Sequence, residues 1–222
     1  MNKLILALCL TIITSVFAVA QDPTDGYKKG EFFIGYSNGQ IDTGLGDIDD
    51  EEFGIDIDER ETFHGFNTSG VYNVSRYFGV KADVSGVYND RDFSFTVPTT
   101  AVGGGTGTGT VSFESKNSLY NFLGGVQIKD NSRSGRFKPF AHALVGAAHA
   151  RTKISNVVCP IGVDCSFIVS GSETGWAGAF GGGIDVRLNN SVQLRAIQVD
   201  YNPVWLDGAR QNNIRLGVGL VF

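Results

Sequence analysis

Apolar and polar residues alternate with a period of two in several stretches of the chain. The alternation is clearest at the C-terminus, where one face is uniformly apolar. That face is made by Ile214, Leu216, Val218, Leu220 and Phe222. The positions between them include Arg215, Gly217 and Gly219. Successive side chains of a β-strand point to opposite faces, so this stretch is predicted to be a strand with one apolar and one mostly polar face.

Eight such stretches are predicted to be strands. They cover about residues 31–38, 62–74, 77–89, 118–128, 137–152, 174–188, 192–205 and 213–222. The first, third and fifth connections are long, whereas the second and sixth are tight turns. Outer-membrane barrels place short turns in the periplasm and longer loops outside. The order of connections therefore fits a barrel with both termini in the periplasm.

Two of the predicted strands are irregular. In the seventh, Val192 and Leu194 are even-numbered, but the apolar positions after them, such as Val199, are odd-numbered. A β-bulge near Ala196 would reset the alternation. The fifth strand consists mostly of small residues, and its pattern leaves open which face carries His142.

The first 20 residues have the features of a cleaved secretion signal. Lys3 precedes an uncharged apolar run from residue 4 to residue 20, which ends in Ala18-Val19-Ala20 before Gln21. This small-x-small ending is the pattern that signal peptidase cuts. The alternative is a membrane anchor, but the run is at the low edge of the length that spans a bilayer. We expect residues 1–20 to be removed and residues 21–222 to form the barrel domain.

A soluble sandwich would show the same alternation, but strand length and aromatic placement favour a membrane barrel. Several predicted strands reach the roughly 9 to 11 residues that a tilted membrane strand needs. Aromatic residues are predicted at both ends of the strands, as in the girdles that mark the two membrane interfaces. The loop-side group is Trp176, Trp205 and Tyr88, and the turn-side group is Phe32, Tyr72, Phe78, Phe140 and Phe222.

Composition and charge narrow the class of protein further. The chain has 30 glycines, five prolines and a single methionine, which does not suit a helical protein. Its formal net charge is −5, and removal of the predicted leader would make it one unit more negative. A mildly acidic chain of this kind is not expected to bind nucleic acid.

The chain resembles the outer-membrane β-barrel family that includes the membrane domain of OmpA and the opacity-type porins. The stretches FGVKADVSGVY and GWAGAFGGGIDVRL are typical of such barrels. The last strand, NNIRLGVGLVF, resembles the C-terminal signal read by the barrel assembly machinery. The resemblance implies an eight-stranded, antiparallel, up-and-down all-β barrel in the outer membrane of a Gram-negative envelope. It also implies contact with outer-membrane lipid and lipopolysaccharide, and with the assembly machinery during biogenesis.

Charged residues are predicted on the inward faces of the strands. They are Glu31, Lys81, Asp83, Asp185, Arg187, Arg195 and Arg215, joined by Asp200 if the bulge forms. An eight-stranded barrel is only wide enough for side chains to fill its interior, so we expect these charges to pair and plug the lumen, with Asp185 and Asp83 accepting from the arginines. The alternative is that they line a narrow passive channel.

Two long connections each partly resemble a ligand-binding motif, but neither matches the motif in full. Ten acidic residues lie between positions 42 and 61, but Glu52 stands where a calcium loop needs glycine, so we expect a solvated loop without a metal. The glycine- and threonine-rich tract at 103–110 lacks the Lys-Ser/Thr ending of a phosphate loop, so it is predicted to be a flexible surface loop. No cofactor is expected.

Cysteine and histidine residues complete the candidate chemistry. Cys159 and Cys165 lie close together in a chain predicted to be exported, which favours a disulfide over free thiols. Some outer-membrane barrels are lipid-modifying enzymes that use histidine, serine and a carboxylate. His64, His142 and His149 show no histidine-x-serine spacing, so no catalytic residue is assigned. No extracellular ligand is assigned.

Overall fold

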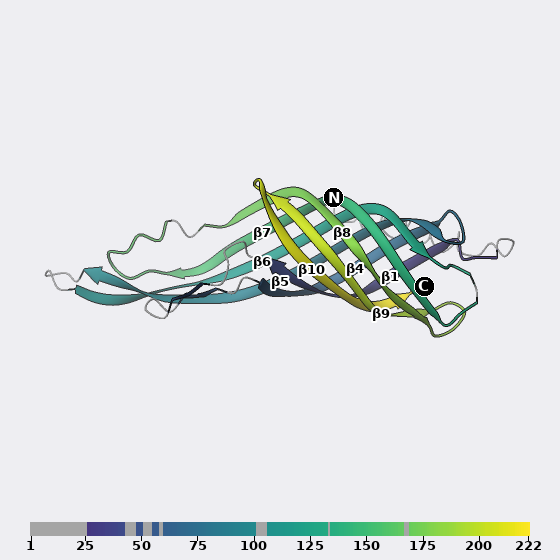
Figure 1. The fold of residues 1–222 in the computed structure, drawn as a ribbon. Coiled ribbons are helices and arrows are strands. Elements are labelled where there is room, and N and C mark those ends of the chain that lie inside the picture. The colour runs from purple at the N-terminus through teal and green to yellow at the C-terminus, as the bar shows by residue number, and fades with distance from the viewer. Residues whose placement is uncertain are drawn as a thin grey trace, which may run out of the picture.

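Eight strands form a closed antiparallel barrel in the computed structural model (Figure 1), which describes residues 26–42, 48–50, 55–57, 60–100, 106–132, 134–166 and 169–222. The barrel strands are β1 (Gly30–Asp42), β4 (Arg60–Asn73), β5 (Phe78–Thr100), β6 (Thr106–Lys129), β7 (Phe137–Val158), β8 (Gly171–Arg187), β9 (Gln193–Leu206) and β10 (Ala209–Val221). β2 (Ile48–Asp50) and β3 (Ile55–Ile57) pair only with each other. The barrel closes by pairing β1 with β10, so the predicted fold is confirmed.

The two ends of the barrel differ in the length of their connections. At one end lie the connections β4–β5, β6–β7 and β8–β9, together with the start of β1 and the end of β10; we name it the turn end. At the other, the loop end, β5 pairs with β6 as far as Thr100↔Thr106 but with β4 only as far as His64↔Tyr88. The β5–β6 hairpin therefore extends beyond the rest of the barrel, as Figure 1 shows.

This hairpin corrects the predicted loop between residues 89 and 118. Thr106–Thr110 of the glycine- and threonine-rich tract belong to β6 and pair with β5, whereas residues 101–105 lie outside the described residues. Glycine has a weak strand preference of its own, but threonine favours strands and the partner strand supplies the hydrogen-bond ladder. Phe93 stacks on Phe113 across the same hairpin, at 5.2 Å between ring centroids.

The β9–β10 connection is also shorter than predicted. Strand β10 begins at Ala209 rather than near 213, and only Asp207 and Gly208 separate it from β9. Both residues have positive φ angles, 46° and 77°, as in the two-residue turns that match the twist of a hairpin. The predicted loop is therefore a tight turn.

The predicted bulge at Ala196 is confirmed. Ile184 pairs with Ile197 and Asp185 pairs with Arg195, so Ala196 has no partner of its own in β8. The extra residue changes the phase of β9. As a result Arg195, Gln198 and Asp200 all face the barrel interior and are buried.

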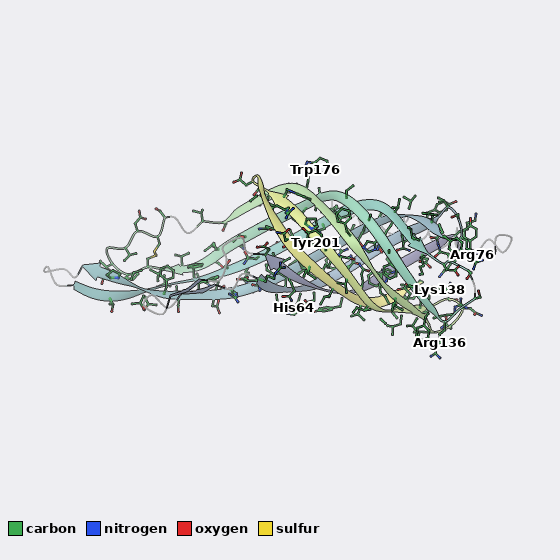
Figure 2. All side chains as sticks on the ribbon, viewed as in Figure 1. His64, Arg76, Arg136, Lys138, Trp176 and Tyr201 are labelled. Carbon is green, nitrogen blue, oxygen red and sulfur yellow. A yellow bond between two sulfur atoms is a disulfide. The ribbon has the colours of Figure 1, made fainter. Side chains whose placement is uncertain are left out.

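The outward faces are apolar, as the alternation predicts. Ile214, Leu216, Val218 and Leu220 are each about 40% exposed in the isolated chain, while Arg215 between them is buried. Trp176, Trp205, Tyr88, Tyr72 and Phe78 are exposed as well, and Figure 2 shows Trp176 projecting from the barrel. No helix among the described residues is long and apolar enough to cross a membrane.

The assignment of Phe140 to the turn-side girdle is wrong. Its side chain is buried in the lumen, because the even-numbered residues of β7 face inward from Lys138 onward. The same register resolves the open question of His142, which also faces inward and is buried. The predicted leader, with Ala18, Ala20 and Gln21 at its cleavage site, lies outside the described residues, as does most of the acidic segment 42–61.

Candidate functional site

The lumen near the turn end is filled by charged side chains. We name them the lumen network: Glu31, Lys81, Asp83, Lys129, His142, Asp185, Arg195, Asp200 and Arg215. Each is buried, and they come from β1, β5, β6, β7, β8, β9 and β10. Nearly every strand of the barrel therefore contributes to one connected group.

One part of the lumen network centres on Asp185. Arg195 donates to it twice, from Nε to Oδ1 at 2.8 Å and from Nη2 to Oδ2 at 3.2 Å. Lys129 donates from Nζ to Asp185 Oδ2 at 2.7 Å and to both carboxylate oxygens of Glu31 at 2.9 Å. Two carboxylates and two cations thus neutralise each other, and the paired geometry is the strong form of a charged hydrogen bond.

The other part centres on Arg215. Its guanidinium donates to Asp83 Oδ1 at 2.8 Å and to Asp200 Oδ2 at 2.7 Å. Lys81 Nζ lies 3.8 Å from Asp83 Oδ2, and Asn67 donates to Asp83 Oδ1 at 2.9 Å. This part also contains two carboxylates and two cations.

Gln198 and His142 connect the two parts. Gln198 accepts from Arg195 at 2.8 Å and donates to Asp200 at 2.7 Å. His142 Nδ1 lies 3.2 Å from Lys81 Nζ, and its Nε2 lies 2.9 Å from Asp200 Oδ1. Because an ammonium group has only donors, Nδ1 acts as the acceptor, which assigns the ring proton to Nε2.

Arg195 is also enclosed by aromatic rings. Its guanidinium carbon lies 4.3 Å from the ring centroid of Phe33 and 4.1 Å from that of Phe140. Cations are attracted to aromatic faces, and the attraction is stronger where water is excluded. The rings therefore fill the space around the arginine and hold it against Asp185.

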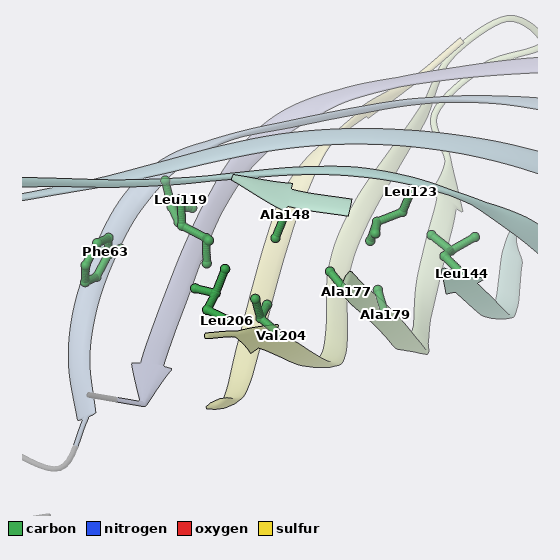
Figure 3. Close-up of a cluster of buried hydrophobic side chains, with 10 residues drawn as sticks. Phe63, Leu119, Leu123, Leu144, Ala148, Ala177, Ala179, Val204 and Leu206 are labelled. Carbon is green, nitrogen blue, oxygen red and sulfur yellow. The ribbon is translucent and has the colours of Figure 1, made fainter. Parts of the chain in front are cut away.

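A second layer of buried side chains lies in the lumen toward the loop end, and it is apolar. It consists of Phe63, Val87, Leu119, Leu123, Leu144, Ala148, Ala177, Ala179, Val204 and Leu206 (Figure 3). Leu144 and Val204 are fully buried. The side chains of this apolar layer come from opposite walls of the barrel, so the lumen is packed like a small protein core. The interior is thus occupied by two successive layers, one charged and one apolar.

Sequence comparison places this architecture in a known family. The model of the outer membrane protein beta-barrel domain matches residues 5–222, nearly the whole chain. The chain belongs to this family. Its members reside in the bacterial outer membrane, so the outward apolar faces of the barrel are its lipid-facing surface. No match to a curated protein sequence was found.

Solved structures show the same fold at low sequence identity. Ail, the attachment invasion locus protein of Yersinia pestis, is 18% identical with a TM-score of 0.51, over 87% of this chain and 98% of that one. A second Ail structure gives 19% identity and a TM-score of 0.50, over 90% of this chain and 100% of that one. Neisserial surface protein A is 9% identical with a TM-score of 0.45, over 89% of this chain and 97% of that one. The likeness to the two Ail structures describes the barrel fold alone.

The structure brings together six of the seven inward charges singled out from the sequence. Arg187 is the exception, because it lies at the mouth of the turn end and donates to the carbonyl of Ser134 at 3.1 Å. Of the two carboxylates predicted to accept from arginines, Asp185 accepts from Arg195 and Asp83 accepts from Arg215. Asp200, conditional on the bulge, binds Arg215.

Sequence reasoning missed Lys129 and the apolar layer. Lys129 lies one residue beyond the predicted end of its strand, although it continues the inward phase of Leu123 and Gln127. The apolar layer contains three alanines, which give a weak pattern in a strand of small residues. Extending the alternation of β6 by one position would have identified Lys129.

The remaining candidate residues lie apart from the lumen network. Cys159 and Cys165 form a disulfide in the β7–β8 loop. His64 contacts Tyr36 and His149 lies 2.8 Å from Thr174 Oγ1, both on the outside of the barrel. Across the described ranges no histidine hydrogen-bonds a serine, and no group of three or more His, Cys, Asp and Glu residues is arranged to hold a metal ion.

Proposed function

We propose that this protein is a non-conducting outer-membrane barrel with a structural or surface-interaction role, whose loop end is its contact surface. The observation that carries the proposal is the filled lumen. A barrel of this size has room only for side chains. Here a layer of charged residues whose charges cancel and an apolar layer occupy the interior in succession. Such an interior is not suited to passing ions.

The elaboration of the loop end supports its role as the contact surface. The β5–β6 hairpin extends beyond the barrel, and the neighbouring β7–β8 loop is closed by a disulfide. At Gly109 a Cβ atom would lie 2.5 Å from Pro160, so the disulfide loop packs directly against the hairpin. Loops held on a rigid scaffold are the usual site of binding functions.

The net charge of the chain indicates which kind of partner the loop end would bind. One Ail structure contains the heparin analogue sucrose octasulfate. Here the net charge is −5, and a shallow pit on the hairpin is lined by Asp90, Asp92 and Glu114 together with Arg91 and Lys116. This acidic balance favours a partner other than a polyanion.

The C-terminal strand supports the expected route of biogenesis. The outward row that ends in Phe222 faces lipid, and Phe222 pairs its backbone with Phe32 at 2.8 and 3.1 Å. An exported precursor with this terminal strand fits recognition by the barrel assembly machinery. Lipopolysaccharide would then surround the loop-end half of the barrel.

Cysteine labelling on intact cells tests which end faces outward. Ser94→Cys introduces a thiol on the exposed extension of β5, and Ser134→Cys introduces one in the exposed β6–β7 turn. A membrane-impermeant maleimide should label Ser94→Cys on intact cells and Ser134→Cys only after lysis. Cys159 and Cys165 stay unlabelled as a disulfide. The reverse pattern, with both variants folded, would reject the loop end as the contact surface.

A further inference from the structure

Residues 26–29, which precede β1, cover part of the lumen opening at the turn end. Tyr27 pairs with Ser132 as an isolated bridge, and the backbone nitrogen of Lys28 donates to the carbonyl of Asn131 at 3.1 Å. The carbonyl of Lys29 accepts from the backbone of Asn73 at 2.7 Å on the other side. The segment is thus held between two walls, and it borders a cavity of about 300 Å³ that lies over the lumen network.

Cations predominate among the charged residues that line this mouth cavity. Lys28, Lys138 and Arg187 line it, and its one carboxylate among the described residues is Glu31. Both oxygens of Glu31 accept from Lys129 at 2.9 Å, so that charge is already neutralised from below. Lys138 donates to the main-chain carbonyls of Asp130, at 3.0 Å, and Ser132, which carry no full charge.

A buried amide in the same cavity lacks partners. The side chain of Asn131 is 2% exposed, and neither its Nδ2 nor its Oδ1 has a hydrogen-bond partner among the described residues. Oε1 of Gln193, another lining residue, is likewise without a donor. Leaving buried polar groups unpaired costs free energy, so their presence points to a ligand that pairs with them.

We propose that the mouth cavity binds an oxyanion of the phosphate class. Its negative charge would be shared by Lys28, Lys138 and Arg187, and its oxygens would accept from Asn131 Nδ2. A hydroxyl on the same ligand, as in a protonated phosphate or a glycerol headgroup, would donate to Asn131 Oδ1 or Gln193 Oε1. A phospholipid headgroup and free phosphate share this chemistry. The site lies at the opposite end of the barrel from the proposed contact surface and is independent of it.

The direction in which the pKa of Lys28 is shifted agrees with an oxyanion site in the mouth cavity. Burial lowers the pKa of its ammonium group; Glu31 opposes this shift, and Lys129 reinforces it. A partly buried cation next to another cation is stabilised by an added anion. Binding of the oxyanion would therefore offset the cost of partly burying Lys28.

Titration of the full folded chain with inorganic phosphate tests the site. In a non-ionic detergent and a phosphate-free buffer, calorimetry should show saturable binding to one site. Lys28→Gln and Asn131→Leu should each weaken it by about tenfold or more, the scale of a hydrogen bond to a charged group. Arg136→Gln is the matched control, because Arg136 is exposed at the same end of the barrel but does not line the cavity (Figure 2). It should change the affinity less than twofold.

A parallel arm identifies the source of the anion. The same variants are compared in nanodiscs of phosphatidylcholine with and without phosphatidylglycerol, by mass spectrometry of retained lipid. Retention of phosphatidylglycerol that is lost in Lys28→Gln and Asn131→Leu supports a lipid headgroup, even if inorganic phosphate binds weakly. Binding in either arm that is unchanged by both variants overturns the proposal, as does an absence of binding in both. Folding of each variant is checked by its heat-dependent migration in gels.

Discussion

The position of single charged residues decides what the lumen can do. Arg195 is buried, paired with Asp185 and placed between two aromatic rings, so its charge is compensated on every side that the structure describes. Lys129 completes the pairing by bridging Asp185 and Glu31, which are far apart in the sequence. The inward faces of these residues could be predicted from alternation. The pairing of Asp185 with an arginine on the next strand could be predicted too. The pairs Lys129–Glu31 and Arg215–Asp83 could not, because each joins strands that are not adjacent in the sequence.

Neutralising one buried carboxylate tests the pairing. Asp185→Asn leaves Arg195 without a charged partner and leaves Lys129 with Glu31 alone, and breaking a buried pair in this way costs about 3 to 5 kcal/mol. We expect urea unfolding in lipid vesicles to show a loss of this size. Asp164→Asn, in the exposed disulfide loop, is the control and should leave the unfolding midpoint unchanged. An equally stable Asp185→Asn barrel would mean that solvent already screens these charges.

At the turn end, an exposed ion pair controls the titration of Asp130. Arg76 donates to both oxygens of Asp130, at 3.0 and 3.1 Å, and these hydrogen bonds hold the pKa of the carboxyl well below its usual range. A lowered pKa means that the pair is intact above the ordinary carboxyl pKa and is lost only as the pH falls further. We expect Arg76→Gln to raise the pKa of Asp130, measured by carbon NMR titration. The pKa of Asp164, lowered by the backbone of Ser166, should stay the same in that variant.

At the scale of the strand, the lipid-facing side was predictable and the inward side only in part. Lipid requires apolar residues along one whole face of each strand, so the row from Ile214 to Phe222 stands out in the sequence. The lumen imposes no such rule, and β7 places His142 and Leu144 inward one after the other. The hairpin extension was missed for a different reason. Phe93, Phe95 and Val97 alternate with polar residues as a strand would, but the glycine- and threonine-rich tract that follows them is typical of a loop.

A charge on the outer face of β10 tests the strand register. Val218 faces lipid and pairs with Tyr36 of β1, so Val218→Arg should cost about 2 to 4 kcal/mol if it lies near the bilayer midplane. Unfolding in lipid vesicles measures the loss. Thr96→Arg, on the exposed extension of β5, places the same side chain in water and should be nearly neutral. Equal effects of the two variants would show that the assigned membrane face is wrong.

At the scale of the whole molecule, the barrel combines a lipid-facing exterior with an interior packed in two layers. The strand count, the closed topology and the outer-membrane location could be read from alternation, connection lengths and the terminal strand. The packing of the lumen could be predicted from the sequence only in part. The charged layer was visible as inward polar residues, while the apolar layer depends on side chains from opposite walls that meet only after closure. Together the two layers make the barrel a rigid support for the loop end.

Conductance of the purified protein in planar lipid bilayers tests the central claim most directly. A lumen closed by the lumen network and the apolar layer should give no steady current, and Asp185→Asn should remain silent because the apolar layer is untouched. A reproducible ohmic current from the unaltered protein, with an ion selectivity that changes in Asp185→Asn, would contradict the account. That result would make the protein a narrow channel lined by the same charges.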